Sequence, residues 1–311
     1  MVDIPGIVLT SGTLRARIVD NSPRFSHLAD SAMEGMSGVA ALMHDAQRKS
    51  VFSDVGLNYE CANTDPPTGQ RRDAWNAPRL APMDIEQVDD ATVRLTQNAA
   101  EASGLNIVSD YRLADPYLDH TFTIWPDHDI RASGTFWASY MNQVQNTSLF
   151  LRARLDGDVD QRWYEATSVG HSGDGKVRYR PFDPSGKTWH EHLQDNPLLR
   201  QDITQTDESR VAAEAAGFRA RDVRAFGGFF YGLVDDFILL YIFREPDFRM
   251  WMSASGSIAL RNPAWDYATS GGPQRAGERR TYHARVVYKP FAGVEDVLRE
   301  VAAFRGAATR L

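Results

Sequence analysis

The sequence has almost no cysteine, since Cys61 is the single one in 311 residues. One thiol excludes an intramolecular disulfide framework and a cysteine-rich structural zinc site. A glycine-rich phosphate loop is missing as well, because Gly227-Gly228 and Gly271-Gly272 lack the following helix and lysine. No G-x-S-x-G elbow occurs either. These absences exclude P-loop nucleotide chemistry and α/β-hydrolase chemistry.

Positive charge and long apolar runs are also scarce. Lys and Arg number 34 against 41 Asp and Glu, which gives a formal charge of −7 and no basic stripe for a nucleic acid. The longest apolar run, Phe237–Phe243, is far shorter than the roughly 20 residues that span a bilayer. The first residues, MVDIPGIVLTSG, lack the regions of a signal peptide. We therefore expect a soluble, cytoplasmic protein without a nucleic-acid or membrane partner, although a trimmed secreted precursor would look the same.

The chain is rich in short segments with alternating apolar and polar residues, which is typical of β-strands. With 42% apolar and 11% aromatic residues, it can build a large core. Predicted strands are Gly12–Val19, Val39–His44, Ser50–Phe52, Gly56–Cys61, Met83–Val88, Thr92–Gln97, Asn106–Leu113, Tyr117–Trp125, Thr135–Met141, Ser148–Leu155, Arg162–Ser172, Lys176–Arg180, Val223–Tyr231, Phe237–Phe243, Arg249–Ser255 and Arg280–Lys289.

Helical signals are few. Glu208–Ala216 and Gly293–Phe304 have helical spacing, whereas Asn21–Gly38 and Ala62–Pro82 are too polar and too rich in proline or glycine for core elements. No repeat and no linker divides the chain. The sequence therefore predicts an all-β fold: one antiparallel β-sandwich domain of two large sheets over residues 1–311, with a few short helices.

Two segments carry a resemblance to a known family: WASYMNQ (Trp137–Gln143) and NPAWDY (Asn262–Tyr267), the latter followed by a terminal strand and helix. Together with the long run of strands, they resemble the galactose mutarotase-like supersandwich of aldose epimerases and of domains in glycoside hydrolases and polysaccharide lyases. The resemblance implies that fold and a carbohydrate-active enzyme. The Asn-His-x-x-x-Asn pattern of aldose epimerases is absent, which argues against simple mutarotase activity.

Several predicted strands place polar and aromatic residues on one face, because alternate residues of a strand share a face. Along Arg162–Ser172 this face holds Trp163, Glu165 and His171, and Arg152 and Arg154 stand opposite an aliphatic set on Ser148–Leu155. Aromatic rings stack on sugars while Arg, His and Ser bind their hydroxyls. The predicted substrate-binding residues are Trp163, Arg152, Arg154, Tyr140, Asn142, Glu60, Arg249, Trp251, Trp265 and His283.

His171 is the predicted proton-transfer residue, because it ends a strand before the turn Ser172–Gly175 and titrates near neutral pH. Glu165 lies on the same face, about 20 Å upstream at roughly 3.3 Å per residue. Asp266, placed in a turn after Pro263, is a second candidate catalytic acid. His120 shares its face with apolar residues, which favours a core histidine over a catalyst.

No metal and no cofactor are expected. His190 and His192 in TWHEHL have no evident third ligand, which a zinc site would need. The sequence thus favours an enzyme that acts on a sugar or oligosaccharide by His/carboxylate acid–base chemistry, either epimerase- or lyase-like. A glycoside hydrolase with a carboxylate pair, a non-catalytic carbohydrate-binding protein and a homo-oligomer assembled through the aromatic face are the alternatives.

Overall fold

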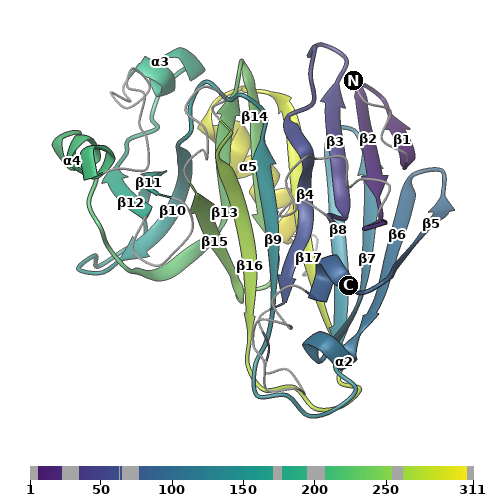
Figure 1. Ribbon diagram of the computed structural model, residues 1–311. Coiled ribbons are helices and arrows are strands. Elements are labelled where there is room, and N and C mark those ends of the chain that lie inside the picture. The colour runs from purple at the N-terminus through teal and green to yellow at the C-terminus, as the bar shows by residue number, and fades with distance from the viewer. Residues whose placement is uncertain are drawn as a thin grey trace. The chain divides into compact units, whose positions relative to one another are not determined.

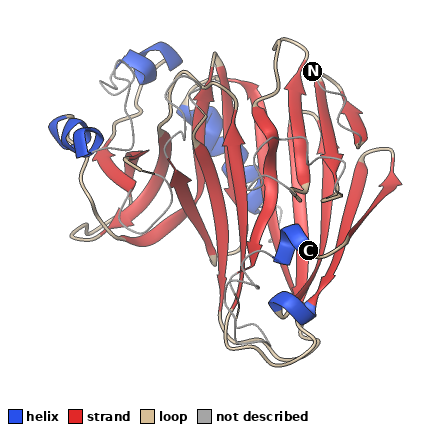
Figure 2. Cartoon of the chain, viewed as in Figure 1, coloured by secondary structure: helices blue, strands red, loops and turns tan. Residues whose placement is uncertain are grey.

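The computed structural model describes residues 6–22, 35–62, 64, 77–170, 177–194, 207–253 and 262–306. Strands make up most of these residues and form two large antiparallel sheets, as a β-sandwich requires (Figures 1 and 2). The predicted fold class is therefore confirmed. Within the described ranges, no helix has the length and apolar character to cross a bilayer.

The first sheet has seven described strands. In spatial order they are β1 (Ile7–Ser11), β2 (Leu14–Val19), β3 (Gly38–His44), β4 (Phe52–Ala62), β9 (Ser133–Met141), β16 (Ala264–Gly271) and β15 (Phe248–Ser253). β4, β9 and β16 are neighbours although they lie far apart in the sequence (Figure 1).

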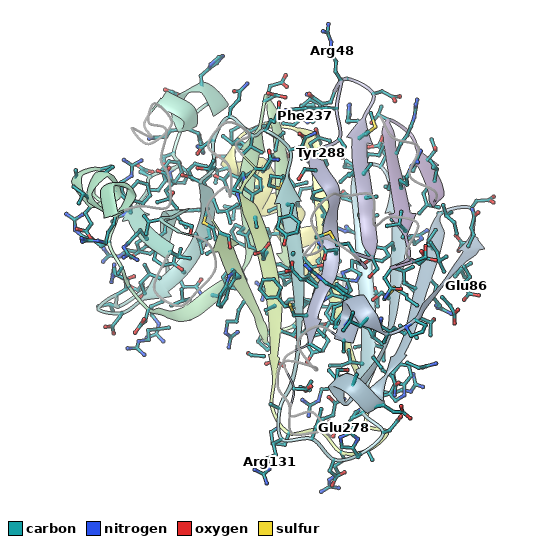
Figure 3. The ribbon with its side chains drawn as sticks, viewed as in Figure 1. Arg48, Glu86, Arg131, Phe237, Glu278 and Tyr288 are labelled. Atoms are coloured by element: carbon teal, nitrogen blue, oxygen red, sulfur yellow. The ribbon has the colours of Figure 1, made fainter. Side chains whose placement is uncertain are left out.

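The second sheet has ten described strands. In spatial order they are β12 (Val177–Pro181), β11 (Arg162–Ser168), β10 (Leu149–Leu155), β13 (Val223–Val234), β14 (Phe237–Phe243), β17 (Arg280–Pro290), β8 (Tyr117–Trp125), β7 (Leu105–Ala114), β6 (Thr92–Ala99) and β5 (Met83–Asp89). β5, the last of these, has exposed acidic residues including Glu86, which Figure 3 labels.

Four short helices have assigned bounds: α2 (Ala100–Ser103), α3 (Trp189–Gln194), α4 (Asp207–Ala215) and α5 (Val294–Gly306). α5 buries Val297, Val301 and Phe304, whose spacing follows the helical period. Its first turn carries Glu295 and Asp296, where acids suit the helix dipole. α5 contacts β14.

The described residues divide into two compact units, each built from three chain segments. Unit 1 lies within Met1–Tyr140, Asp247–Arg249 and Asp266–Ala284, and unit 2 lies within Met141–Pro246, Met250–Trp265 and Arg285–Leu311. The single domain that the sequence suggests remains a prediction.

Unit 1 has an aromatic core around β8. Leu118, His120, Phe122 and Ile124 alternate along this strand and are fully buried, as their spacing predicts. The His120 ring stacks on Tyr111 with ring centroids 4.6 Å apart and meets Trp137 edge-on at 4.3 Å.

Unit 2 has a core of aliphatic and aromatic residues. The predicted aliphatic face of β10 (Leu149, Leu151, Ala153 and Leu155) is fully buried. Every residue of β14 is buried too, and the rings of Phe237 and Tyr288, labelled in Figure 3, lie 5.2 Å apart. Gly232 packs so closely on Trp265 that a Cβ atom there would lie 2.2 Å from the indole ring.

The turn expected for Asp266 is wrong, and helix α3 and strand β9 have features that the sequence analysis did not predict. Asp266 lies inside strand β16 rather than in a turn, because Pro263 precedes the strand and costs no ladder hydrogen bond. TWHEHL forms helix α3, begun by Thr188, whose Oγ1 caps the Glu191 N–H at 3.4 Å while Glu191 bonds back. β9 joins the seven-stranded sheet, whereas its sequence neighbours β8 and β10 join the other.

Candidate active site

Three of the predicted residues, Glu60, Tyr140 and Asp266, share one face of unit 1. Tyr59, Trp137 and Tyr267 mark the opposite face, because Trp137 stacks on Tyr59 at 4.9 Å and on Tyr267 at 6.3 Å. Strand alternation then sends Glu60 of β4, Tyr140 of β9 and Asp266 of β16 to the other side. The three strands are adjacent, so these side chains form one cluster.

Both carboxylate oxygens of Glu60 are engaged. Arg79 Nη2 lies 2.8 Å from Glu60 Oε1, and the Tyr140 hydroxyl donates a hydrogen bond to Glu60 Oε2 at 2.8 Å. The Arg79 and Glu60 side chains are only 15% and 20% exposed. A half-buried ion pair with an added charge-assisted hydrogen bond fixes the position of the Glu60 carboxylate.

Asp266 is the buried carboxyl of the cluster, with 2% of its surface exposed. The backbone N–H of Ser139 donates to Asp266 Oδ1 at 2.8 Å. Burial raises the pKa of Asp266 well above its ordinary value, the Ser139 hydrogen bond opposes this, and the charge of Glu60 adds to the rise. Burial therefore favours the protonated form of Asp266, which lies near the carboxylate that Glu60 pairs with Arg79.

The surroundings of this cluster also affect the Tyr140 hydroxyl and the Cys61 thiol. Burial, followed by the charge of Glu60 and its hydrogen bond, raises the pKa of the Tyr140 hydroxyl, while the charge of Arg79 lowers it. Burial and Glu60 likewise raise the pKa of the Cys61 thiol. Tyr140 therefore remains a hydrogen-bond donor, and Cys61 remains a neutral thiol without the reactivity of a thiolate.

Arg79 is the residue that sequence reasoning missed, because it falls in the predicted surface loop Ala62–Pro82. Residues 77–80 instead form one helical turn, closed by the Ala81 N–H to the Ala77 carbonyl at 2.9 Å. The Asn21 and Gln97 side-chain amides both donate to the carbonyls of Pro78 and Ala81. These long-range bonds, which no local pattern reveals, hold Arg79 against Glu60.

His120 is a core residue, as its neighbours in the sequence suggest. Its Nδ1 lies 2.8 Å from the Tyr267 hydroxyl, and among the described residues its buried Nε2 has no hydrogen-bond partner. Burial lowers the pKa of His120 from 6.5 to about 3. The imidazole is therefore neutral at physiological pH and faces only aromatic rings of unit 1.

Glu165 belongs to unit 2, together with Trp163, Arg152 and Arg154. Glu165 is buried and forms an ion pair with Arg180 of β12. Burial raises the pKa of Glu165, while the charge and hydrogen bond of Arg180 oppose the rise. The strand register places Phe150 opposite Glu165 and Arg152 opposite Trp163, so these four residues share one face.

The other predicted residues are spread over both units. Asn142 and Trp251 are half-buried in unit 2, where Trp265 is a core residue whose indole N–H donates to the Thr147 carbonyl at 3.2 Å. Arg249 is exposed and His283 half-buried, both in unit 1. His171 lies outside the described residues and stays a prediction. No three His, Cys, Asp or Glu side chains in the described part of the chain are placed to hold a metal ion.

Comparison with known proteins supports the fold. No protein-family model and no curated protein matches the chain. Among solved structures, it is similar to a candidate aldose 1-epimerase from Escherichia coli K12, with TM-score 0.53, 10% identity and coverage of 91% of this chain and 98% of the other. It is also similar to an aldose epimerase homologue from C. elegans, with TM-score 0.51, 13% identity and coverage of 91% and 98%. The predicted galactose mutarotase-like fold is thereby confirmed.

Proposed function

We propose that this chain is an enzyme that acts on a sugar or oligosaccharide by acid–base chemistry, with Asp266 as the acid and Glu60 as the base. The observation that carries the proposal is the contrast between the environments of the two carboxyl groups. Asp266 is buried with a raised pKa, whereas Glu60 pairs with Arg79. Environments that push two titratable groups apart in this way assign the acid and the base.

Each of the two carboxyl groups has an oxygen available for its part in proton transfer. Glu60 uses one lone pair on each oxygen for Arg79 and Tyr140, and a carboxylate oxygen has a second lone pair for a substrate proton. Asp266 uses Oδ1 to accept from Ser139, which leaves Oδ2 to carry and donate the proton. Tyr140 holds Glu60 in place and, as a neutral phenol, adds a hydroxyl donor beside it.

Epimerisation or lyase-type elimination is the reaction class that we favour. In both reactions a base removes a proton from a sugar carbon, and an acid protonates either an oxygen or the opposite face of the sugar. In the proposed pair, Glu60 is the base and Asp266 is the acid. The aldose epimerase names of the two structural neighbours agree with this choice. His171, the predicted third participant, retains that role as a prediction.

Glycoside hydrolysis is the second candidate, and the carboxylate pair itself favours it. Hydrolases use one protonated and one ionised carboxyl group on either side of the glycosidic bond. Here burial favours the protonated form of Asp266, and Glu60 forms an ion pair with Arg79. The products separate the candidates: a hydrolase releases a new reducing end, a lyase forms an unsaturated sugar, and an epimerase changes only configuration.

The test is turnover of a panel of sugars and oligosaccharides, followed by NMR, with Asp266→Asn and Glu60→Gln. Each variant keeps a hydrogen-bonding amide but cannot transfer the proton, so we expect turnover to fall by about 10²–10⁴-fold. Glu101→Gln, which changes an exposed acid of unit 1, is the matched control and should leave turnover unchanged. Wild-type rates in Asp266→Asn would overturn the proposal, and binding without any turnover would favour the non-catalytic alternative.

A further inference from the structure

In unit 2, the exposure of the side chains on one face of strand β10 increases along the strand. This strand lies between β11 and β13. Phe150 is buried, Arg152 is half-buried and Arg154 is exposed, although the three alternate along one face. Arg152 lies directly across from Trp163 of β11, which is also half-buried. The guanidinium-bearing Arg152 and the indole-bearing Trp163 are therefore cross-strand neighbours at the boundary between the buried and exposed parts of this face.

Arg152 lies without a counter-charge among the described residues. In the described part of the chain no carboxylate pairs with it, and its Nε is buried without a hydrogen-bond partner. The nearest acid along the face, Glu165, is neutralised by Arg180. Because a buried donor without a partner costs free energy, such an exception calls for an acceptor that arrives with a ligand.

The Trp163 ring is held in a defined position. Phe229 and Tyr231 of β13 meet it edge-on, with ring centroids 5.7 Å and 6.3 Å away. These contacts cover the ring edges and leave part of the side chain exposed. A fixed, half-exposed indole is the group that stacks on the C–H face of a sugar ring at low entropic cost.

A β-bulge in β13 brings the backbone of Gly227 close to Arg152. Leu151 pairs with Phe230 and Ala153 pairs with Phe226, so residues 227–229 stand opposite Arg152 alone. A Cβ atom on Gly227 would lie 3.1 Å from the Arg152 Cβ, and Gly228 has φ of +80°. Arg305 donates to the Gly227 carbonyl at 2.8 Å and fixes the bulge. Bulges of this kind commonly re-aim side chains beside binding sites.

We propose that Arg152 and Trp163 form a binding subsite for a sugar residue that carries a carboxylate. The inference deepens the proposed function, because it rests on a saccharide as the substrate and names its acidic class. Arg152 offers a bidentate fork to the carboxylate while Trp163 stacks on the ring.

The experiment measures binding by isothermal titration calorimetry, with methyl glucuronide and methyl glucoside as a pair that differs only in the carboxylate. Wild type should bind the glucuronide more tightly. Arg152→Gln should weaken glucuronide binding by at least about tenfold, the loss expected for a charge-assisted hydrogen bond, and should change glucoside binding far less. Trp163→Ala should weaken the binding of both sugars.

Arg162→Gln is the matched control, because Arg162 adjoins Trp163 but pairs with Ala153 of the aliphatic face. It removes the same charge from the opposite side of the strand and should leave glucuronide binding unchanged. Circular dichroism confirms that each variant is folded.

Equal binding of the two glycosides by wild type, or equal losses in Arg152→Gln and Arg162→Gln, would overturn the subsite. Tighter binding of glucose 6-phosphate than of the glucuronide would overturn the carboxylate assignment. Turnover that depends on Asp266 without any preference for the glucuronide leaves the proposed function standing and removes only this inference. Glucuronide binding that depends on Arg152 but is not followed by turnover leaves the subsite standing and removes the proposed function.

Discussion

At the scale of single residues, Asp266 couples the stability of the protein to pH. Its pKa is raised in the folded state, so the unfolded chain releases the proton first as pH increases. The folded state then loses stability from the ordinary Asp pKa upward until the folded-state pKa is passed. Asp266→Asn removes this loss and still offers an oxygen to the Ser139 N–H.

We therefore expect the free energy of unfolding of Asp266→Asn to fall less between pH 4 and pH 8 than that of wild type. Urea titrations at several pH values measure this slope, and the comparison of slopes cancels any fixed cost of the new amide. Glu101→Gln serves again as the exposed control. Parallel pH profiles for wild type and Asp266→Asn would show that Asp266 is ionised in the folded protein.

His120 makes the stability of the protein depend on pH on the acid side. The folded protein keeps it neutral down to about pH 3, whereas the unfolded chain binds a proton below 6.5. Stability is therefore lost as pH falls through this interval, by up to about 1.4 kcal/mol per pH unit.

His120→Gln should flatten the acid side of the stability profile, because glutamine can still bond to Tyr267 but does not titrate. Chemical unfolding between pH 3 and pH 7 measures the effect. The exposed His190, changed to Gln, is the matched control and should retain the wild-type slope. An unchanged slope in His120→Gln would assign the acid sensitivity to other groups.

At the scale of elements, the contact between β13 and β16 within unit 2 depends on the absence of a side chain at Gly232. A Cβ atom on Gly232 would lie 2.2 Å from the Trp265 ring. Trp265 is fully buried and bonded to the Thr147 carbonyl, so the ring cannot move away cheaply. Gly232→Ala should lower the free energy of unfolding by about 1–3 kcal/mol, the usual cost of overpacking.

Gly272→Ala is the control for this change, because a Cβ atom there meets nothing within 4 Å. Thermal unfolding followed by circular dichroism compares the two variants. Equal melting temperatures for Gly232→Ala and wild type would mean that β13 and β16 adjust to the extra methyl group.

β5 ends the ten-stranded sheet with an acidic surface. Asp84 and Glu86 lie exposed on one face of the strand, and Glu86 is 3.9 Å from Arg94 of the neighbouring strand. Charged side chains on an edge strand discourage pairing with the edge of another molecule. Replacing both acids with Thr, which suits strands, should increase self-association at neutral pH.

Light scattering over a concentration series measures this self-association. The double variant Glu101→Gln and Asp160→Asn removes the same charge from exposed positions outside β5 and should behave like wild type. Equal scattering by the two double variants would mean that net charge, rather than the edge strand, controls association.

Strong alternation made several elements predictable from sequence. β8 and β14 have the predicted bounds, because one alternates cleanly and the other is a continuous apolar run between acidic turns. α3 and β16 escaped prediction, since a one-and-a-half-turn helix has little periodicity and Pro263 suggested a turn. The β13 bulge was also invisible, because Gly227-Gly228 fits a turn or a loop equally well.

At the scale of the whole molecule, the candidate residues were easier to predict than their grouping. Glu60, Tyr140 and Asp266 were each recognisable as polar groups beside aromatic residues, yet their convergence depends on β4, β9 and β16 being neighbours. Strand order in a sandwich follows from long-range pairing that a single sequence does not reveal. Arg79 required even more, because its position depends on the amides of Asn21 and Gln97.

The interleaving of the two units also sets the order in which the protein can mature during synthesis. Unit 1 needs Asp266–Ala284, which leave the ribosome long after β1–β9 and after most of unit 2. Until then β9 lacks its partner β16, Trp137 lacks Tyr267, and Glu60 lacks the carboxyl group proposed to act with it. Non-local pairing of this kind slows folding. The nascent chain must therefore keep the sheet without its β16 partner, and the proposed catalytic pair forms only after Asp266 has left the ribosome.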